Sequence, residues 1–231
     1  KLGEFINKWI HSKINSVLKN LIDLKNIKEN NSSIKALAYQ LYENNGVLKR
    51  EQVSDYLKKL EQNERKILRE LGVKFGRYHV FLYRLIKPEA VSLRTQLWKN
   101  YHQKYFELKP PTFGLNFFYD KNLKNRNFML LCGFEKFDNL FVRIDILERL
   151  FMQIINSKDE KEIKMTPEML NLLGCSKENF IKLLKAMNYK ILEKDGEIFF
   201  VYMRKKQIRK TFDKKPTKEN PFGVLKNFNF N

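Results

Sequence analysis

Residues 166–202 read TPEMLNLLGCSKENFIKLLKAMNYKILEKDGEIFFVY, and they give the strongest indication of the fold. The pair Thr-Pro at 166–167 is typical of the start of a helix, and Gly174 is typical of its end. Ser176 can cap a second helix that follows after a tight turn. Apolar residues with helical spacing predict the buried stripe of that second helix: Phe180, Leu183, Leu184 and Met187.

The residues on either side of these two helices predict strands and one further helix. Asp195-Gly196 indicates a two-residue hairpin, with Lys194 and Glu197 as an opposite-charge pair across the turn. The segment EIKM at 162–165 can form a first strand. A helix before it has apolar residues with the same spacing: Leu147, Leu150, Phe151 and Ile154. This order predicts a winged helix-turn-helix domain over residues 139–208.

The rest of the chain predicts a mainly α fold with some β structure, of the α+β class. Residues 1–106 form the expected helical domain, in which residues 4–28 make a long amphipathic helix. Residues 107–138 are expected to be a connector with one or two short strands, one of them at 128–132. Residues 209–231 are expected to be a basic, disordered tail.

The charge of the chain favours a polyanionic partner. Its 231 residues include 45 Lys and Arg against 26 Asp and Glu, which gives a formal net charge of +19. Such an excess creates a field that attracts nucleic acid. Other acidic partners, or a role in solubility alone, remain open as alternatives.

The second helix of the stretch at 166–202 carries the first set of candidate nucleic-acid-binding residues. If its apolar stripe is buried, Lys177, Lys182, Lys185 and Asn188 face outward, and Lys190 follows. Lysine suits contact with phosphate groups, which position a protein without reading sequence. Only Asn188 is suited to reading a base, so binding that does not depend on sequence is favoured.

Two more basic segments give further candidates. Arg77, Arg84 and Lys87 lie among aromatic residues, and Arg204, Lys205 and Lys206 begin the basic end of the chain. Aromatic side chains next to cations suit single-stranded RNA, in which bases stack and cations contact phosphates. For Phe75 and Phe81 we expect a place in the core instead.

The sequence predicts no catalytic site, metal site or cofactor in this chain. It contains no phosphate-binding loop, dinucleotide-binding loop, zinc-protease or nucleophile-elbow motif. Its Cys132 and Cys175 lie far apart, and three histidines are scattered, so a zinc site is not expected. No apolar run is long enough for a membrane helix. The chain lacks an initiator Met, so we expect a trimmed or partial product.

Two segments resemble a known family. RKILRELGVKFGRYHVFLYRLIKPEAVSLRTQLW (65–98) and EMLNLLGCSKENFIKLLKAMNYK (168–190) are similar to the region that follows the motor in bacterial relatives of the mitochondrial degradosome RNA helicase, a DExH-type enzyme. The terminal NPFGVL is similar more loosely. The similarity covers most of residues 35–230, in the same order, with LGVKFGRYHVF, LIKPEA and LLGCS as its most distinctive motifs.

The resemblance implies an RNA-binding accessory region of an ATP-dependent RNA helicase. It would guide or grip single-stranded RNA, whereas ATP and magnesium would bind only to an upstream motor. It also implies a location in the bacterial cytoplasm or the mitochondrial matrix, which agrees with the two thiols. Two alternatives stay open: a scaffolding subunit of a ribonucleoprotein assembly, with the winged helix in contact with protein, and a DNA-binding regulator.

Overall fold

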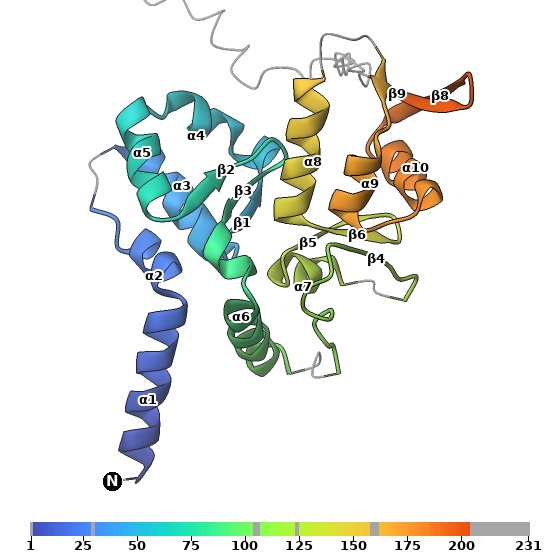
Figure 1. Cartoon of the computed structure of the whole chain (residues 1–231). Coiled ribbons are helices and arrows are strands. Elements are labelled where there is room, and N and C mark those ends of the chain that lie inside the picture. The colour runs from blue at the N-terminus through green and yellow to red at the C-terminus, as the bar shows by residue number, and fades with distance from the viewer. Residues whose placement is uncertain (1, 29–30, 104–106, 123–124, 158–161, 204–231) are drawn as a thin grey trace, which may run out of the picture.

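The protein is a mixed α and β structure whose helices surround three small antiparallel sheets (Figure 1). It is described here by a computed structural model that covers residues 2–28, 31–103, 107–122, 125–157 and 162–203. The mixture of helices with short strands confirms the expected α+β class. The expected disordered tail at 209–231 and the basic residues Arg204, Lys205 and Lys206 lie outside the described residues.

The N-terminal part packs short helices against one sheet. Its helices are α1 (Leu2–Val17), α2 (Lys19–Lys25), α3 (Ser32–Glu43), η1 (Arg50–Val53), α4 (Ser54–Lys59) and α5 (Gln62–Glu70). Its strands are β1 (Val47–Lys49), β2 (Val73–Phe75) and β3 (His79–Leu82), in the order β1-β3-β2. Apolar side chains from α2, α3, α5 and the sheet form one core, which includes Leu24, Leu37, Leu68 and Leu82.

The long helix expected at 4–28 is two helices. Leu18 leaves the helical conformation, with φ −101° and ψ 18°, and separates α1 from α2. Apolar residues of α2 are buried, but α1 has no buried residue. Phe5 and Trp9 of α1 are 68% and 60% exposed. The amphipathic pattern therefore predicted that these residues are helical. It did not predict that the apolar face of α1 stays exposed, which follows because α1 extends away from the core (Figure 1).

The middle of the chain forms a second sheet with helices at its edge. These elements are η2 (Tyr83–Ile86), α6 (Pro88–Tyr101), β4 (Phe117–Tyr119), α7 (Arg126–Leu131), β5 (Phe134–Phe137) and β6 (Leu140–Arg143). The strand expected at 128–132 is wrong, because these residues belong to α7 and its end. The Asn125 side chain caps α7 by accepting a hydrogen bond from the Phe128 N–H at 3.0 Å. A short apolar run fits a strand or a buried helix equally well, and here the cap favours the helix.

The C-terminal part has the order of elements that the stretch 166–202 and its neighbours predicted. It consists of α8 (Ile144–Asn156), β7 (Ile163–Lys164), α9 (Pro167–Leu173), α10 (Lys177–Ala186), β8 (Tyr189–Lys194) and β9 (Glu197–Tyr202). The sheet order is β7-β9-β8. Gly174 ends α9 in the left-handed conformation, and the Ser176 hydroxyl caps α10 by accepting from the Asn179 N–H. Thr166 stands at the start of α9, without a side-chain capping hydrogen bond.

The hairpin of β8 and β9 turns at Asp195 and Gly196, which have φ of 51° and 76°. Two consecutive residues with positive φ match the turn that an Asp-Gly pair favours. Lys194 and Glu197 face each other across the turn in the strand register. Their charges, however, pair with other strands: Lys194 contacts Glu162 and Glu197 contacts Lys164, each at 2.5 Å. The expected pair across the turn is therefore replaced by two pairs with the β7 segment.

The middle sheet joins the parts that flank it. The sequence suggested that a connector ends at residue 138. In the structure, β5 and β6 lie on either side of this position and pair as one hairpin of the middle sheet. Arg94 of α6 is 3% exposed, and its guanidinium donates to the carbonyls of Asn45, Leu85 and Leu131 at 2.5–2.8 Å. Arg94 thus connects backbone from the N-terminal part with backbone from α7.

Candidate nucleic-acid interface

The helix α10 presents three lysines to solvent. Phe180, Leu183 and Leu184 are fully buried against the core of the C-terminal part, so they fix the rotation of the helix. Lys177, Lys182 and Lys185 consequently lie on the outer face, and all three are exposed. This placement agrees with the expectation from the apolar stripe.

The α10 lysines differ from Lys194 of the neighbouring hairpin in having no acidic partner among the described residues. No ion pair or side-chain hydrogen bond joins Lys177, Lys182, Lys185 or Lys190 to another residue in the part of the chain that the structure describes. Lysine ammonium groups that make no internal ion pair remain available for phosphate contacts. We call Lys177, Lys182, Lys185 and Lys190 the α10 cationic face.

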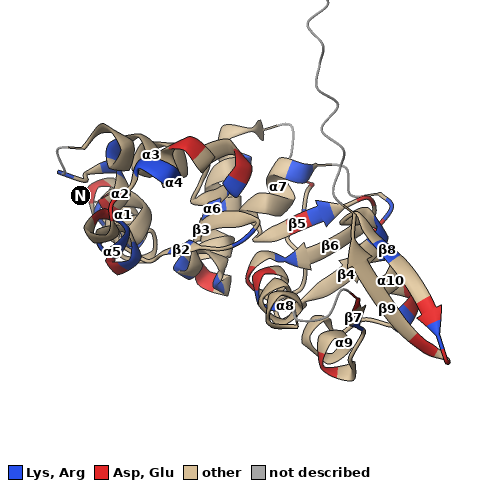
Figure 2. Ribbon diagram, turned by 90° about the horizontal axis from the view of Figure 1, so that it is seen from above, with Lys and Arg blue, Asp and Glu red and all other residues tan. Residues whose placement is uncertain are grey.

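The tip of the hairpin has the opposite character. Glu193, Asp195 and Glu197 are exposed around the turn and outnumber Lys194 there, and Figure 2 shows Lys segments on α10 and β8. A phosphate strand would be repelled by the tip and attracted to α10 and the base of β8. The positive charge of this part therefore lies along α10 and the base of β8, and the excess of negative charge lies at the hairpin tip.

Asn188 does not have the position that the sequence predicted. The helix ends at Ala186, and Asn188 adopts the left-handed conformation in the turn before β8, with φ 64°. Its N–H donates to the Lys185 carbonyl and its carbonyl accepts from the Met203 N–H, both at 3.0 Å. Asn tolerates positive φ better than most residues, so its place here has a backbone reason. It is exposed, but it lies in a turn and not on the outer face of α10.

Arg77 lies at the contact between the N-terminal and C-terminal parts. Its guanidinium carbon is 5.6 Å from the centre of the Phe151 ring on α8. Burial raises the pKa of Tyr189, the first residue of β8, and the charge of Arg77 opposes that rise. Arg77 is therefore near Tyr189, at the start of β8.

The turn that carries Arg77 is held by one carboxylate. Glu148 of α8 accepts hydrogen bonds from three successive backbone N–H groups, those of Arg77, Tyr78 and His79, the last two at 2.9 and 2.8 Å. Successive N–H groups that point to one place form a nest for anions. In this protein the nest holds Glu148, so the glycines at 72 and 76 do not mark a phosphate loop.

Arg84 and Lys87 belong to a different surface. Lys87 donates to the Tyr83 hydroxyl at 3.2 Å, and its ammonium lies 4.8 Å from the centre of the Tyr83 ring. Arg84 is exposed and lines a hollow with Lys19 and Asp23 of the N-terminal part. The predicted cations therefore do not form one surface, because Arg77 contacts α8 whereas Arg84 and Lys87 lie around η2. Phe81 is 3% exposed and Phe75 is partly buried, as expected of core residues.

A buried group of charged residues lies behind the Arg77 turn, and the sequence did not indicate it. His79 is 2% exposed, with Nε2 2.7 Å from Glu135 Oε2 and Nδ1 3.4 Å from Glu148 Oε1. Arg126 contacts the same Glu135 carboxylate at 2.9–3.1 Å. Burial alone would lower the pKa of His79, but the hydrogen bonds with Glu135 and Glu148 outweigh it and raise this pKa.

These buried groups bind the parts of the chain together. The imidazole of His79 is enclosed, so no substrate reaches it. Burial raises the pKa of the Cys132 thiol to about 12 and that of Cys175 to about 11, which keeps both thiols protonated at neutral pH. Within the described residues, no group of three His, Cys, Asp or Glu side chains could hold a metal ion.

Comparison with known proteins gives no relative. No protein-family model, curated protein or solved structure matches this chain. Among the described helices, none is both long and apolar enough to cross a membrane.

Proposed function

We propose that this chain is an RNA-binding accessory region of an ATP-dependent DExH-type RNA helicase. In this proposal the α10 cationic face holds single-stranded RNA through phosphate contacts, and the chain itself performs no reaction. The observation that carries the proposal is the outward display of Lys177, Lys182 and Lys185 from one helix, without an acidic partner among the described residues.

The arrangement around α10 supports a winged helix-turn-helix module. Three helices (α8, α9 and α10) and a three-stranded sheet alternate in the order that this module has, with a tight turn at Gly174 between α9 and α10. Such modules present the second helix of the pair to a groove or a phosphate backbone. The helix that would be presented here is α10.

The chemistry of the face favours phosphate over bases. Lysine acts on phosphate as a point charge and carries little sequence information. Asn188, the one candidate for reading a base, serves the turn through its backbone. A sequence-specific DNA-binding regulator is therefore the weaker alternative.

The helicase assignment rests on the similarity of 65–98 and 168–190 to the region that follows the motor in bacterial relatives of the mitochondrial degradosome RNA helicase. ATP and magnesium would belong to that motor. The bacterial cytoplasm or the mitochondrial matrix is the location that the similarity implies.

One observation favours a second function, as a scaffolding subunit of a ribonucleoprotein assembly. The helix α1 displays Phe5, Ile6 and Trp9 on a face with no partner among the described residues. An exposed apolar patch of this kind is typical of a protein contact. This function predicts weak RNA binding by the chain alone and tight association with protein.

A salt titration of RNA binding separates the two functions. Filter binding with an unstructured oligouridylate should give an affinity whose logarithm falls linearly with the logarithm of salt concentration, with a slope of about −0.7 per phosphate contacted. A slope of about −2 or steeper supports the RNA-binding function. Absence of salt-sensitive binding at low salt would reject it in favour of the scaffold.

A further inference from the structure

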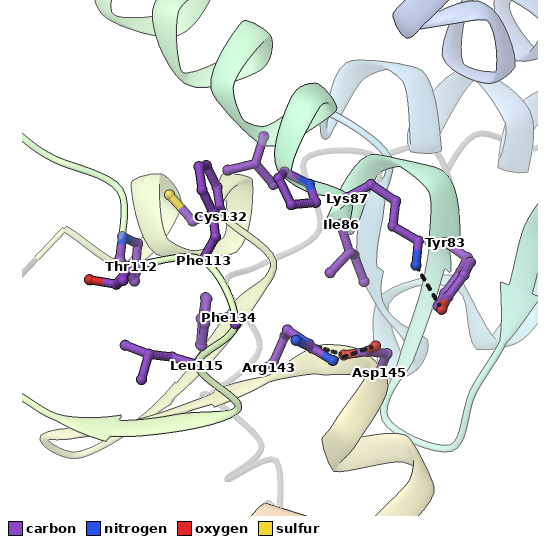
Figure 3. Close-up of a pocket in the computed structure, with 14 residues that line it drawn as sticks. Tyr83, Ile86, Lys87, Thr112, Phe113, Leu115, Cys132, Phe134, Arg143 and Asp145 are labelled. Carbon is purple, nitrogen blue, oxygen red and sulfur yellow. Dashed lines mark hydrogen bonds and ion pairs between the residues drawn. The ribbon is translucent and has the colours of Figure 1, made fainter.

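A pocket with a volume of about 220 Å³ lies between η2, the loop before β4 and the hairpin of β5 and β6 (Figure 3). Thr112, Phe113 and Leu115 of the loop stand on one side, and Tyr83 and Lys87 stand on the other. Pockets for drug-sized ligands have about 300–1,000 Å³, so this one suits a smaller group, such as a single planar ring system.

The loop side offers an exposed aromatic surface. Phe113 and Leu115 are 50% and 39% exposed although both line the pocket. Gly114 between them has φ 95°, a conformation in which glycine is favoured. The loop thus turns two apolar side chains toward solvent at the pocket mouth, where an aromatic ring can stack on a flat ligand.

The strand side offers a hydrogen-bonding pair. Arg143 Nε lies 2.7 Å from Asp145 Oδ1, and Arg143 also contacts Asp145 Oδ2 at 3.2 Å. Asp145 Oδ1 also accepts a hydrogen bond from the Ile146 N–H at 3.0 Å. The donors Arg143 Nε and Ile146 N–H together occupy both acceptor positions of this oxygen. The guanidinium has further N–H donors, and Oδ2 has one further acceptor position. A donor and an acceptor therefore stand side by side at the pocket.

Each of the four RNA bases has a matching edge. The Watson–Crick edge of every base carries one hydrogen-bond donor next to one acceptor, and in a duplex the partner base covers both. Single-stranded RNA is recognised where unstacked bases meet aromatic side chains and hydrogen-bond along this edge. The same chemistry in every base makes such a contact tolerant of sequence.

Positive charge at the mouth completes the match. The Lys87 ammonium is exposed over the Tyr83 ring, and Lys87 lines the pocket. A nucleotide whose base enters the pocket brings its phosphate to the mouth, where Lys87 stands. This gives Lys87, which lies apart from the α10 cationic face, a role of its own.

We propose that this pocket takes one unpaired nucleobase of a single-stranded RNA, of any of the four kinds, and so selects single strands over duplexes. The base stacks on Phe113, and its Watson–Crick edge meets Arg143 and Asp145. This inference rests on the proposed RNA-binding function, but it concerns a separate surface that can be tested separately.

The test compares two RNA probes and three variants of the full chain. Phe113→Ala removes the stacking surface, Phe113→Tyr retains it, and Tyr39→Ala removes an aromatic residue that is 59% exposed on α3. The probes are an oligouridylate and a blunt RNA duplex of equal length. Loss of one base–aromatic stack should weaken single-strand binding by about tenfold or more, without changing duplex binding. Phe113→Tyr and Tyr39→Ala should bind both probes as the unaltered chain does.

A second measurement needs no variant. An RNA with one 2-aminopurine should lose fluorescence on binding if its base stacks on Phe113, and the loss should shrink when that base is paired in a duplex. Equal binding of oligouridylate by Phe113→Ala and the unaltered chain, or no change in fluorescence, would overturn the pocket proposal. If RNA binding and its salt dependence persist in that case, the proposed function stands without the pocket. If the unaltered chain binds no RNA, both fail.

Discussion

The carboxylate of Glu148 lies where a side chain at Gly76 would have to be. A Cβ placed on Gly76 would come closer than 3.0 Å to the carboxyl carbon and both carboxyl oxygens of Glu148. Arg50 also donates to the Gly76 carbonyl at 2.7 Å. Gly76 and Glu148 are 72 positions apart in the sequence. Their close contact fixes the position of the β2–β3 turn, which carries Arg77, against α8.

We expect Gly76→Ala to destabilise the protein by about 1–3 kcal/mol, because the added methyl group forces the turn away from Glu148 and weakens its N–H contacts. Urea unfolding followed by circular dichroism measures the change in the free energy of unfolding. Gly3→Ala is the control, because a Cβ at Gly3 meets nothing within 4 Å and lies in the helix α1. Equal stability of the two variants would contradict this role of Gly76.

Stability should depend on pH through His79 and Glu135. The pKa of His79 is raised, so its contribution to stability is complete below the unfolded value of 6.5 and is lost as pH rises through the folded value. The pKa of Glu135 is lowered: burial opposes this shift, but the hydrogen bond and charge of His79 outweigh it. The contribution of Glu135 is therefore present above its unfolded value of 4.5 and is lost as pH falls through the lower folded value.

The variant His79→Gln removes the titrating imidazole and keeps a side-chain donor for Glu135. The free energy of unfolding is measured in urea at about pH 6 and about pH 9. It should fall more between these two pH values in the unaltered chain than in this variant. Identical pH dependence in the two proteins would show that His79 is not charged in the folded state.

Arg94 should be irreplaceable even by lysine. Its guanidinium reaches the carbonyls of Asn45, Leu85 and Leu131, and burial lowers its pKa to about 10 without an acidic partner among its hydrogen bonds. A lysine cannot reproduce this planar fork, so we expect Arg94→Lys to cost about 2–4 kcal/mol. Arg149→Lys on the exposed surface of α8 is the matched control, expected within about 0.5 kcal/mol of the original. A similar effect of both substitutions would contradict the account.

Asn188 should matter for the turn and not for RNA. Glycine adopts φ 64° without strain, so Asn188→Gly should keep stability within about 1 kcal/mol. It should also leave RNA affinity unchanged across oligonucleotides of different sequence. Selective loss of affinity for one sequence would mean that the Asn188 amide reads a base after all.

The sequence predicted the C-terminal part well because its signals are local. A left-handed Gly174, a capping Ser176 and an Asp-Gly turn each act over a few residues, and each has its expected place. The outward direction of Lys182 followed from the buried stripe on the same helix. The end of α10, two residues before Asn188, was missed because helix ends depend on small energy differences.

The sequence could not predict the features of the structure that depend on contacts between residues far apart in the chain. The carboxylate of Glu148 is about 70 positions from the N–H groups that it binds, and Glu135 is 56 positions from His79. Nothing near these residues in the chain indicates either contact. The apolar run at α7 fitted a strand as well as a helix, and the apolar face of α1 suggested burial that the fold does not provide.

The salt dependence of RNA binding, measured with the α10 cationic face altered, tests the central claim most directly. The variant Lys177→Gln/Lys182→Gln/Lys185→Gln removes three cations, and Lys35→Gln/Lys59→Gln/Lys66→Gln removes three exposed lysines from α3, α4 and α5. We predict that the first variant binds oligouridylate more weakly and with a salt slope shallower by about 2, whereas the second changes little. Equal slopes for the two variants would contradict it.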